Sequence, residues 1–258
     1  MSRMLIVAGL VLAFLAPALA AAAQDSSQVG EFVVTAERRT QQLQNVPVAV
    51  SGYAGSTYAP TAQPHVVVFH RADNLISYVQ VVCDTREPSA RLSELQATFA
   101  NLFAAAAQSG GTIEFSSEDS GVLVPLKPES IIGLMRPGGR PDTTMVTFIV
   151  KTHIGPTDTF EAATARVESF VHKTKLVGRS LVARTGDWEL TLITPRQYRS
   201  AIVAAIAKDA AETMKPFGPG YAVTLVGLDR PVSWSRSGSL ELALFIPYAM
   251  TIGPAPGH

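Results

Sequence analysis

Cysteine and charge are both scarce in this sequence. Cys83 is the only cysteine among 258 residues, so no disulfide can form within the chain. Charged residues make up 16% of the sequence, and 21 Lys plus Arg balance 21 Asp plus Glu. Because phosphate binding needs a clustered basic excess, this balance argues against nucleic acid as a partner. Hydrophobic residues, at 47%, argue against wholesale disorder and can supply a stabilising core without disulfides.

The short motifs of metal and nucleophilic catalysis are also missing. The sequence has no H-E-x-x-H or C-x-x-C spacing, no G-x-S-x-G and no P-loop. Cys83 shares strand parity with Val79 and Val81, which favours a small buried hydrophobe over a nucleophile. We therefore expect no metal, no cofactor and no enzymatic activity. A small envelope hydrolase is the alternative, since folding could pair any two of four acidic residues, Glu114, Asp187, Glu189 and Glu241.

Long hydrophobic runs are absent after the first 23 residues. Residues 1–23 match a cleavable signal peptide, because Arg3 is basic, residues 4–15 are apolar and an Ala-rich cleavage site precedes Gln24. Cleavage after Ala20 is the competing site, and a retained membrane anchor is the alternative interpretation. No cysteine stands at the cleavage site, which excludes a lipoprotein anchor. The prediction is an exported protein of the periplasm, in the Gram-negative cell envelope, with no transmembrane segment after cleavage.

A short apolar segment, Glu-Phe-Val-Val-Thr-Ala, follows this signal. It has adjacent valines and no Pro or Gly, so it can lie extended and add to an exposed sheet edge of another protein. The longer run EFVVTAERRTQQLQNVPVAVSGY, residues 31–53, resembles the N-terminus of a TonB-dependent outer-membrane receptor. In that family an E-x-V-V-T-A-like box binds the energy-coupling protein TonB, and a V-P-V-A-V-S run opens the plug domain.

This resemblance implies a partner and a binding segment. It predicts that the periplasmic domain of TonB binds six residues of this chain, Glu31, Phe32, Val33, Val34, Thr35 and Ala36. The alternative is a vestigial box, because no receptor follows: the barrel of that family needs many more strands than this chain can supply. Residues 24–64 are predicted as an extended, mobile tail, and the alternative is that Val46–Val50 adds an edge strand to the domain.

Residues 65–252 are predicted to form one α+β domain, followed by a flexible C-terminus at 253–258. Apolar residues recur at helical spacing in three segments, at 88–108, 158–174 and 195–215. Strands are expected at 66–69, 76–84, 112–117, 122–126, 143–153, 177–184, 188–194, 221–228 and 239–250, with a loop at 127–142 and a polar turn at 233–238. Short turns between strand pairs favour antiparallel sheets packed against three helices, in the order ββαβββαββαββ. The last strand is expected to have one buried face.

This order of elements resembles the SIMPL domain of exported bacterial proteins. The similar stretches are DTREPSARLSEL after a strand, TFIVKT and DTFEAATARV across a strand-to-helix step, and an Ala-rich helix that ends in MKPFG. The family's Gly-rich opening strand is missing here. The resemblance implies an envelope protein, often a homo-oligomer, without established catalytic residues. The predicted function is therefore that of a binding or scaffold protein that contacts a partner or itself.

Overall fold

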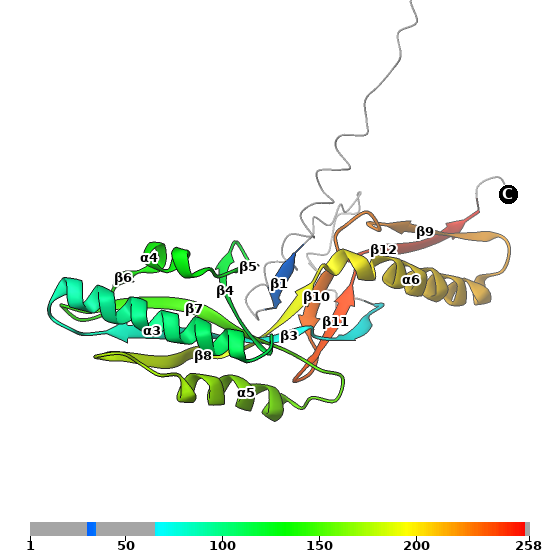
Figure 1. Ribbon diagram of the computed structural model, residues 1–258. Helices are drawn as coiled ribbons and strands as arrows, with labels where there is room; N and C mark the ends of the chain where they lie inside the picture. The colour runs from blue at the N-terminus through cyan, green and yellow to red at the C-terminus, as the bar shows by residue number, and fades with distance from the viewer. Residues whose placement is uncertain (1–29, 35–64, 256–258) are drawn as a thin grey trace, which may run out of the picture.

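The computed structural model describes residues 30–34 and 65–255. The expected signal peptide, the rest of the expected tail and residues 256–258 lie outside these ranges. The described protein is α+β, as predicted, and all its strand pairings are antiparallel. No helix within the described ranges has the length and apolarity to cross a membrane. Figure 1 shows an elongated molecule, with a large sheet and two long helices at one end and smaller sheets at the other.

The larger sheet closes on itself. Its strands are β1 (Glu31–Val34), β3 (Asn74–Cys83), β4 (Ile113–Asp119), β5 (Val122–Pro125), β6 (Arg136–Pro137), β7 (Thr144–His153) and β8 (Ser180–Ile193). They lie in the order β3-β8-β1-β5-β4-β7-β6, and β3 also pairs with β7. Six strands therefore form a ring, and the two-residue β6 adds to it beside β7. The predicted hairpin of β4 and β5 is confirmed, with Ser120 and Gly121 in its turn.

Two helices cover the outer face of the ring, α3 (Pro88–Gln108) and α5 (Phe160–Lys173). α3 has the predicted bounds, with a proline in its first turn and the Glu87 carboxylate accepting a first-turn N–H. α5 begins later than predicted, because Thr159 rather than Asp158 provides its N-cap. The predicted loop at 127–142 also contains a 3-10 turn, the short helix α4 (Ile131–Leu134) and β6.

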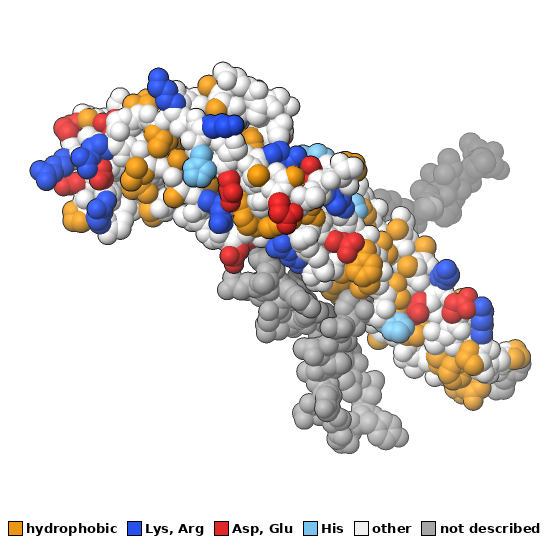
Figure 2. Space-filling view, turned by 90° about the horizontal axis from the view of Figure 1, so that it is seen from below, with side chains coloured by type: hydrophobic (Ala, Val, Ile, Leu, Met, Phe, Trp, Pro, Cys, Tyr) orange, Lys and Arg blue, Asp and Glu red, His pale blue; other side chains and the backbone are white. Residues whose placement is uncertain are grey.

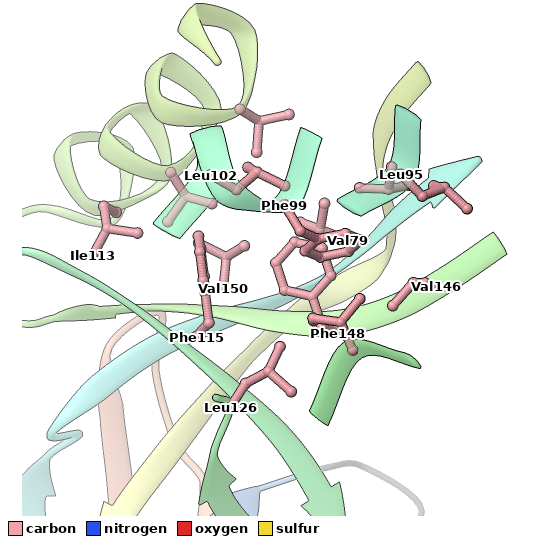
Figure 3. Packing of buried hydrophobic residues seen from close by; sticks show 14 of the residues in the cluster. Val79, Leu95, Phe99, Leu102, Ile113, Phe115, Leu126, Val146, Phe148 and Val150 are labelled. Carbon is pink, nitrogen blue, oxygen red and sulfur yellow. The ribbon is translucent and has the colours of Figure 1, made fainter. Parts of the chain in front are cut away.

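The core between helices and ring is rich in aromatic rings. Figure 3 shows Leu95, Phe99 and Leu102 of α3 pointing onto the strands beneath them. The rings of Phe99 and Phe148 have centroids 5.4 Å apart, and those of Phe115 and Phe148 lie 5.1 Å apart, both edge to face. This packing holds β3, β4 and β7 in place against α3.

β8 is one strand where a hairpin was predicted. The turn was expected at Thr185–Gly186, but Ser180–Ile193 is continuous and pairs with β3 from Cys83↔Ser180 to Asn74↔Thr191. The pairs Tyr78↔Thr185 and Ile76↔Glu189 show that β8 advances four residues while β3 advances two. Gly186, at φ 71°, lies in the resulting bulge. The hairpin prediction is wrong because β3 offers pairing to both halves of this segment.

The other end of the molecule contains two small sheets and the third long helix. A three-stranded sheet holds β10 (Ser233–Arg236), β11 (Glu241–Phe245) and β2 (Val68–Arg71), in that order. A two-stranded sheet holds β12 (Ala249–Pro254) and β9 (Tyr221–Val226). The helix α6 (Arg199–Met214) is flanked by 3-10 turns at Pro195–Tyr198 and Lys215–Phe217.

Four expectations for the C-terminal residues are corrected. The single strand expected at 239–250 is split between β11 and β12, which belong to different sheets, with Pro247 between them. The polar turn expected at 233–238 contains β10, whose Trp234 is only 6% exposed. Ala243 and Leu244 are both buried, so β11 is covered on both faces rather than one. β12 reaches Pro254, two residues past the expected end of the domain.

Candidate functional site

The segment predicted to bind a partner is itself a strand of the ring. β1 pairs with β8 from Glu31↔Ile193 to Val34↔Leu190, and with β5 at Phe32↔Val122. Two further backbone bonds hold the segment: Val33 N–H donates to Gly121 O at 3.2 Å, and Thr194 N–H to Gly30 O at 2.6 Å. We call the space between β8 and β5 that β1 fills the slot. Residues 31–34 are therefore not the free tail that was expected, because both neighbouring strands offer backbone partners. Thr35 and Ala36 lie outside the described residues.

The Glu31 carboxylate is held by three side chains of the slot. Lys151 Nζ lies 2.7 Å from Oε2, Asn74 Nδ2 donates to Oε1 at 2.6 Å, and the Thr191 hydroxyl donates to Oε1 as well. Lys151 Nζ also lies 2.9 Å from Glu114 Oε2. The side chains of Lys151 and Glu31 are 14% and 11% exposed, so this ion pair is largely withdrawn from water. The donors come from β7, β3 and β8, which makes the site a property of the domain rather than of the tail.

The charge of Lys151 is maintained by its carboxylate neighbours. Burial alone would lower the pKa of Lys151, but hydrogen bonds and Coulomb attraction from Glu31 and Glu114 outweigh it, so the pKa lies above its ordinary value. The ammonium is therefore protonated at neutral pH. A buried ion pair of this kind contributes little net stability, but removing one partner leaves the other charge uncompensated. The pair consequently favours one strand sequence over others in the slot.

The next two residues of β1 face opposite sides of the sheet. Val33 is fully buried inside the ring, in a cluster with Ile76, Leu123 and Ile149. Phe32 points outward, and its ring centroid lies 5.6 Å from that of Trp234 on β10. Three consecutive side chains thus meet an ionic site, an aromatic surface and an aliphatic pocket. Only an extended segment presents its side chains in this alternating way.

The entry to the slot is shaped by Gly30. Its φ of 141° lies in a region that side chains rarely adopt, and a Cβ there would approach Val122 Cγ1 to 3.2 Å. A glycine just before Glu31 therefore lets the chain enter between the two strands. Neither this glycine nor the Lys151, Asn74 and Thr191 donors were found from the sequence. One signal was present: Lys151 directly follows Phe148, Ile149 and Val150 in a predicted strand, so a charged side chain adjoins three apolar ones.

Cys83 occupies the environment that its strand parity predicted. It is fully buried in the cluster that contains Val79 and Val81. Its Sγ lies 3.2 Å from Glu94 Oε2, which also accepts hydrogen bonds from the Thr85 hydroxyl at 2.6 Å and from a backbone N–H. These bonds, led by the one from Thr85, hold the pKa of Glu94 below its ordinary value. The thiol beside this carboxylate ties β3 to α3.

The other titratable residues considered from the sequence are spread over separate parts of the fold. His70 Nε2 lies 2.6 Å from the Tyr198 hydroxyl, and His65 Nε2 lies 3.4 Å from Asp209. Of the four acidic residues considered for acid–base chemistry, Glu114 is paired with Lys151, and Glu241 accepts from the Ser237 hydroxyl at 3.3 Å in a different sheet. Within the described ranges no three His, Cys, Asp or Glu side chains are grouped as a metal site would require.

One hollow of the described protein is lined by three arginines. It measures about 670 Å³ and lies at the loop before β7, where Arg91, Arg136 and Arg140 line it. Arg91 donates to the carbonyls of Thr85 and Asp142 at 2.7 and 2.9 Å, so its guanidinium is engaged in holding the loop. The hollow does not include the slot.

Comparison with known proteins adds no family to this description. No protein-family model matches the chain, and no curated protein matches it.

Proposed function

We propose that this protein is an exported binding protein of the periplasm, built on a SIMPL-like domain, which uses residues 31–36 to bind the periplasmic domain of TonB. One observation supports the proposal. The described part of the segment, Glu31–Val34, has strand conformation and pairs with a strand on each side. Strand addition to a partner requires that conformation and those backbone groups.

The slot makes this proposed binding competitive. The backbone groups that TonB would bind are the ones that β8 and β5 bind in this structure. The segment must therefore leave the slot before TonB can pair with it. We expect a peptide of residues 24–62 to bind the TonB domain more tightly than the mature chain does.

Calorimetric titration against the TonB domain tests the proposal. Val33→Pro in the peptide should abolish binding, because proline removes a backbone donor, whereas Val33→Ile in the peptide is the matched control and should bind normally. Variants that weaken the hold of the slot, such as Asn74→Ala, should bring the affinity of the whole chain toward that of the peptide. If the peptide shows no binding at high micromolar concentration, the segment is a relic and TonB is not the partner.

Export is tested separately. The mature chain recovered from a periplasmic extract should begin at Gln24, or at Ala21 if the competing site is used. N-terminal sequencing distinguishes these outcomes, and an intact Met1 in that fraction would contradict the export proposal.

A further inference from the structure

We infer that the slot is a strand-acceptor site selective for the sequence Glu-Phe-Val, and that its ligand in trans is residues 31–34 of a second copy of this chain. This role of the slot does not depend on TonB, since acceptor and ligand both belong to this protein. The copies would exchange their β1 strands, each completing the ring of the other.

The first support is that the domain supplies every contact that recognises the strand. The donors to Glu31 and the aliphatic pocket around Val33 belong to strands between residues 74 and 193. The Phe32 ring meets Trp234, on a sheet outside the ring. The ligand is four contiguous residues, and its single carboxylate meets the single Lys side chain that faces it. A strand of the same sequence from another copy therefore meets the same partners.

The second support is the length of chain between ligand and domain. Residues 35–64, which number 30, join Val34 to the start of the domain at His65. Such a chain can extend about 100 Å, whereas a domain of this size has a radius of gyration of about 16 Å. The strand can therefore reach its own slot or that of a neighbour. Tethering gives the strand a millimolar effective concentration at its own slot, so we expect the closed monomer to dominate at micromolar concentration.

A reciprocal charge exchange tests the inference on the full mature chain. In Glu31→Lys, residue 31 of the strand carries the same charge as Lys151 of its own slot. In Lys151→Glu, residue 151 of the slot carries the same charge as Glu31 of its own strand. Mixed together, each copy carries the strand that matches the slot of the other. Light scattering coupled to size exclusion should show monomers of each variant alone and a one-to-one dimer in the mixture. The double variant, with both changes in one chain, is the matched control and should return to a monomer.

Each outcome bears on the inference. A mixture that stays monomeric, while circular dichroism shows both variants folded, overturns it, and so does equal dimerisation of either variant alone. Should a single variant not fold alone, the mixture is refolded from denaturant. Rescue of folding as a dimer supports strand exchange, and failure of the mixture while the double variant folds overturns it.

A second measurement leaves the slot unmutated. A protease site is placed between residues 50 and 56, the purified chain is cleaved, and a fluorescent peptide of residues 28–38 is added. The peptide should displace the cleaved N-terminal fragment. The Glu31→Lys peptide should bind at least about 30-fold more weakly, because the substitution removes the buried, hydrogen-bonded carboxylate of Glu31. Equal binding of a scrambled peptide would show that the slot does not recognise the sequence.

Discussion

The closed ring and the β9–β12 sheet differ in whether their strands are paired along both edges. In the ring, β3 pairs with both β7 and β8, and β1 pairs with both β8 and β5. Within the described residues, β9 and β12 pair only with each other. Their sequences, YAVTLV and AMTIGP, contain no charged residue. Natural sheets often carry charges on such edges to prevent association, and this one does not.

The two sheets also differ in how deeply their side chains are buried. Inside the ring, Val33, Ile76 and Ile149 are at most 1% exposed. In the two-stranded sheet, Tyr221 is 48% and Val226 is 61% exposed. Local opening requires little free energy where few apolar contacts are lost. We therefore expect the ring and its helices to form the most stable part of the protein, and the β9–β12 sheet the least stable.

The largest expected effect distinguishes the buried strand β11 from the neighbouring β12. Leu244→Asp places an unpaired charge at a fully buried position and should unfold the protein, since such a charge costs several kcal/mol. Thr251→Asp is the matched variant on the exposed outer face of β12 and should change the free energy of unfolding by less than about 0.5 kcal/mol. Urea denaturation followed by circular dichroism measures both. Similar losses would show that the two-stranded sheet is packed as tightly as β11.

The next effect concerns the ion pair inside the ring. Lys151→Met leaves the Glu31 carboxylate buried without its cation and should lower the free energy of unfolding by about 3 kcal/mol. It should also speed hydrogen exchange at Phe32 and Val33, because the strand is held less firmly. Adding Glu31→Gln removes the orphaned charge and should restore part of the stability. A double variant as unstable as the sum of the two single variants would contradict coupling between these residues.

Alkaline pH should weaken the two ends of the molecule through different groups. The raised pKa of Lys151 stabilises the ring below its ordinary value of 10.5, and that contribution is lost as the pH rises through the folded-state pKa. Burial raises the pKa of Tyr198, beside α6, from 10.0 to about 12, so its contribution is present below pH 10 and lost toward pH 12. Stability should therefore fall above about pH 10.

Two variants separate these alkaline contributions. Lys151→Met and Tyr198→Phe should each flatten the dependence of the unfolding free energy on pH in this range. Denaturation at pH 9, 10 and 11 measures the slopes. If the slope of the unfolding free energy against pH is unchanged in both variants, other groups cause the loss of stability at alkaline pH.

The parts of the fold that the sequence predicted depend on neighbours close in the chain. α3 was bounded correctly because its proline, its apolar stripe and Gly110–Gly111 all lie within one segment. The β4–β5 hairpin was found because its turn residues stand between two short apolar runs. In both cases the signal is local, and no distant residue had to be known.

The slot could not be predicted in this way. Glu31 lies 120 residues from Lys151 and 160 from Thr191, and no periodicity links positions so far apart. The same limit explains the error at β8, where Thr185–Gly186 has the composition of a turn and becomes a bulge only because β3 lies beside it. The strand conformation of residues 31–34 was expected, but its own domain was not predicted as the partner.

The smallest expected effect concerns the exposed tip of the β9–β12 end. Phe217 and Tyr221 are 44% and 48% exposed, and their ring centroids lie 5.8 Å apart. Figure 2 shows hydrophobic side chains gathered at the tip of this end, beside acidic and basic side chains. A half-exposed aromatic pair contributes less than the roughly 0.5–1.5 kcal/mol of a buried one. Phe217→Ser should therefore lower the free energy of unfolding by no more than about 0.5 kcal/mol.

Phe148→Ala, in the aromatic core under α3, is the contrasting variant and should cost about 3–5 kcal/mol, because it leaves a cavity in close packing. Thermal and urea unfolding of both variants would measure the difference between the two ends, and a loss above about 2 kcal/mol from Phe217→Ser would place the tip within the cooperative core.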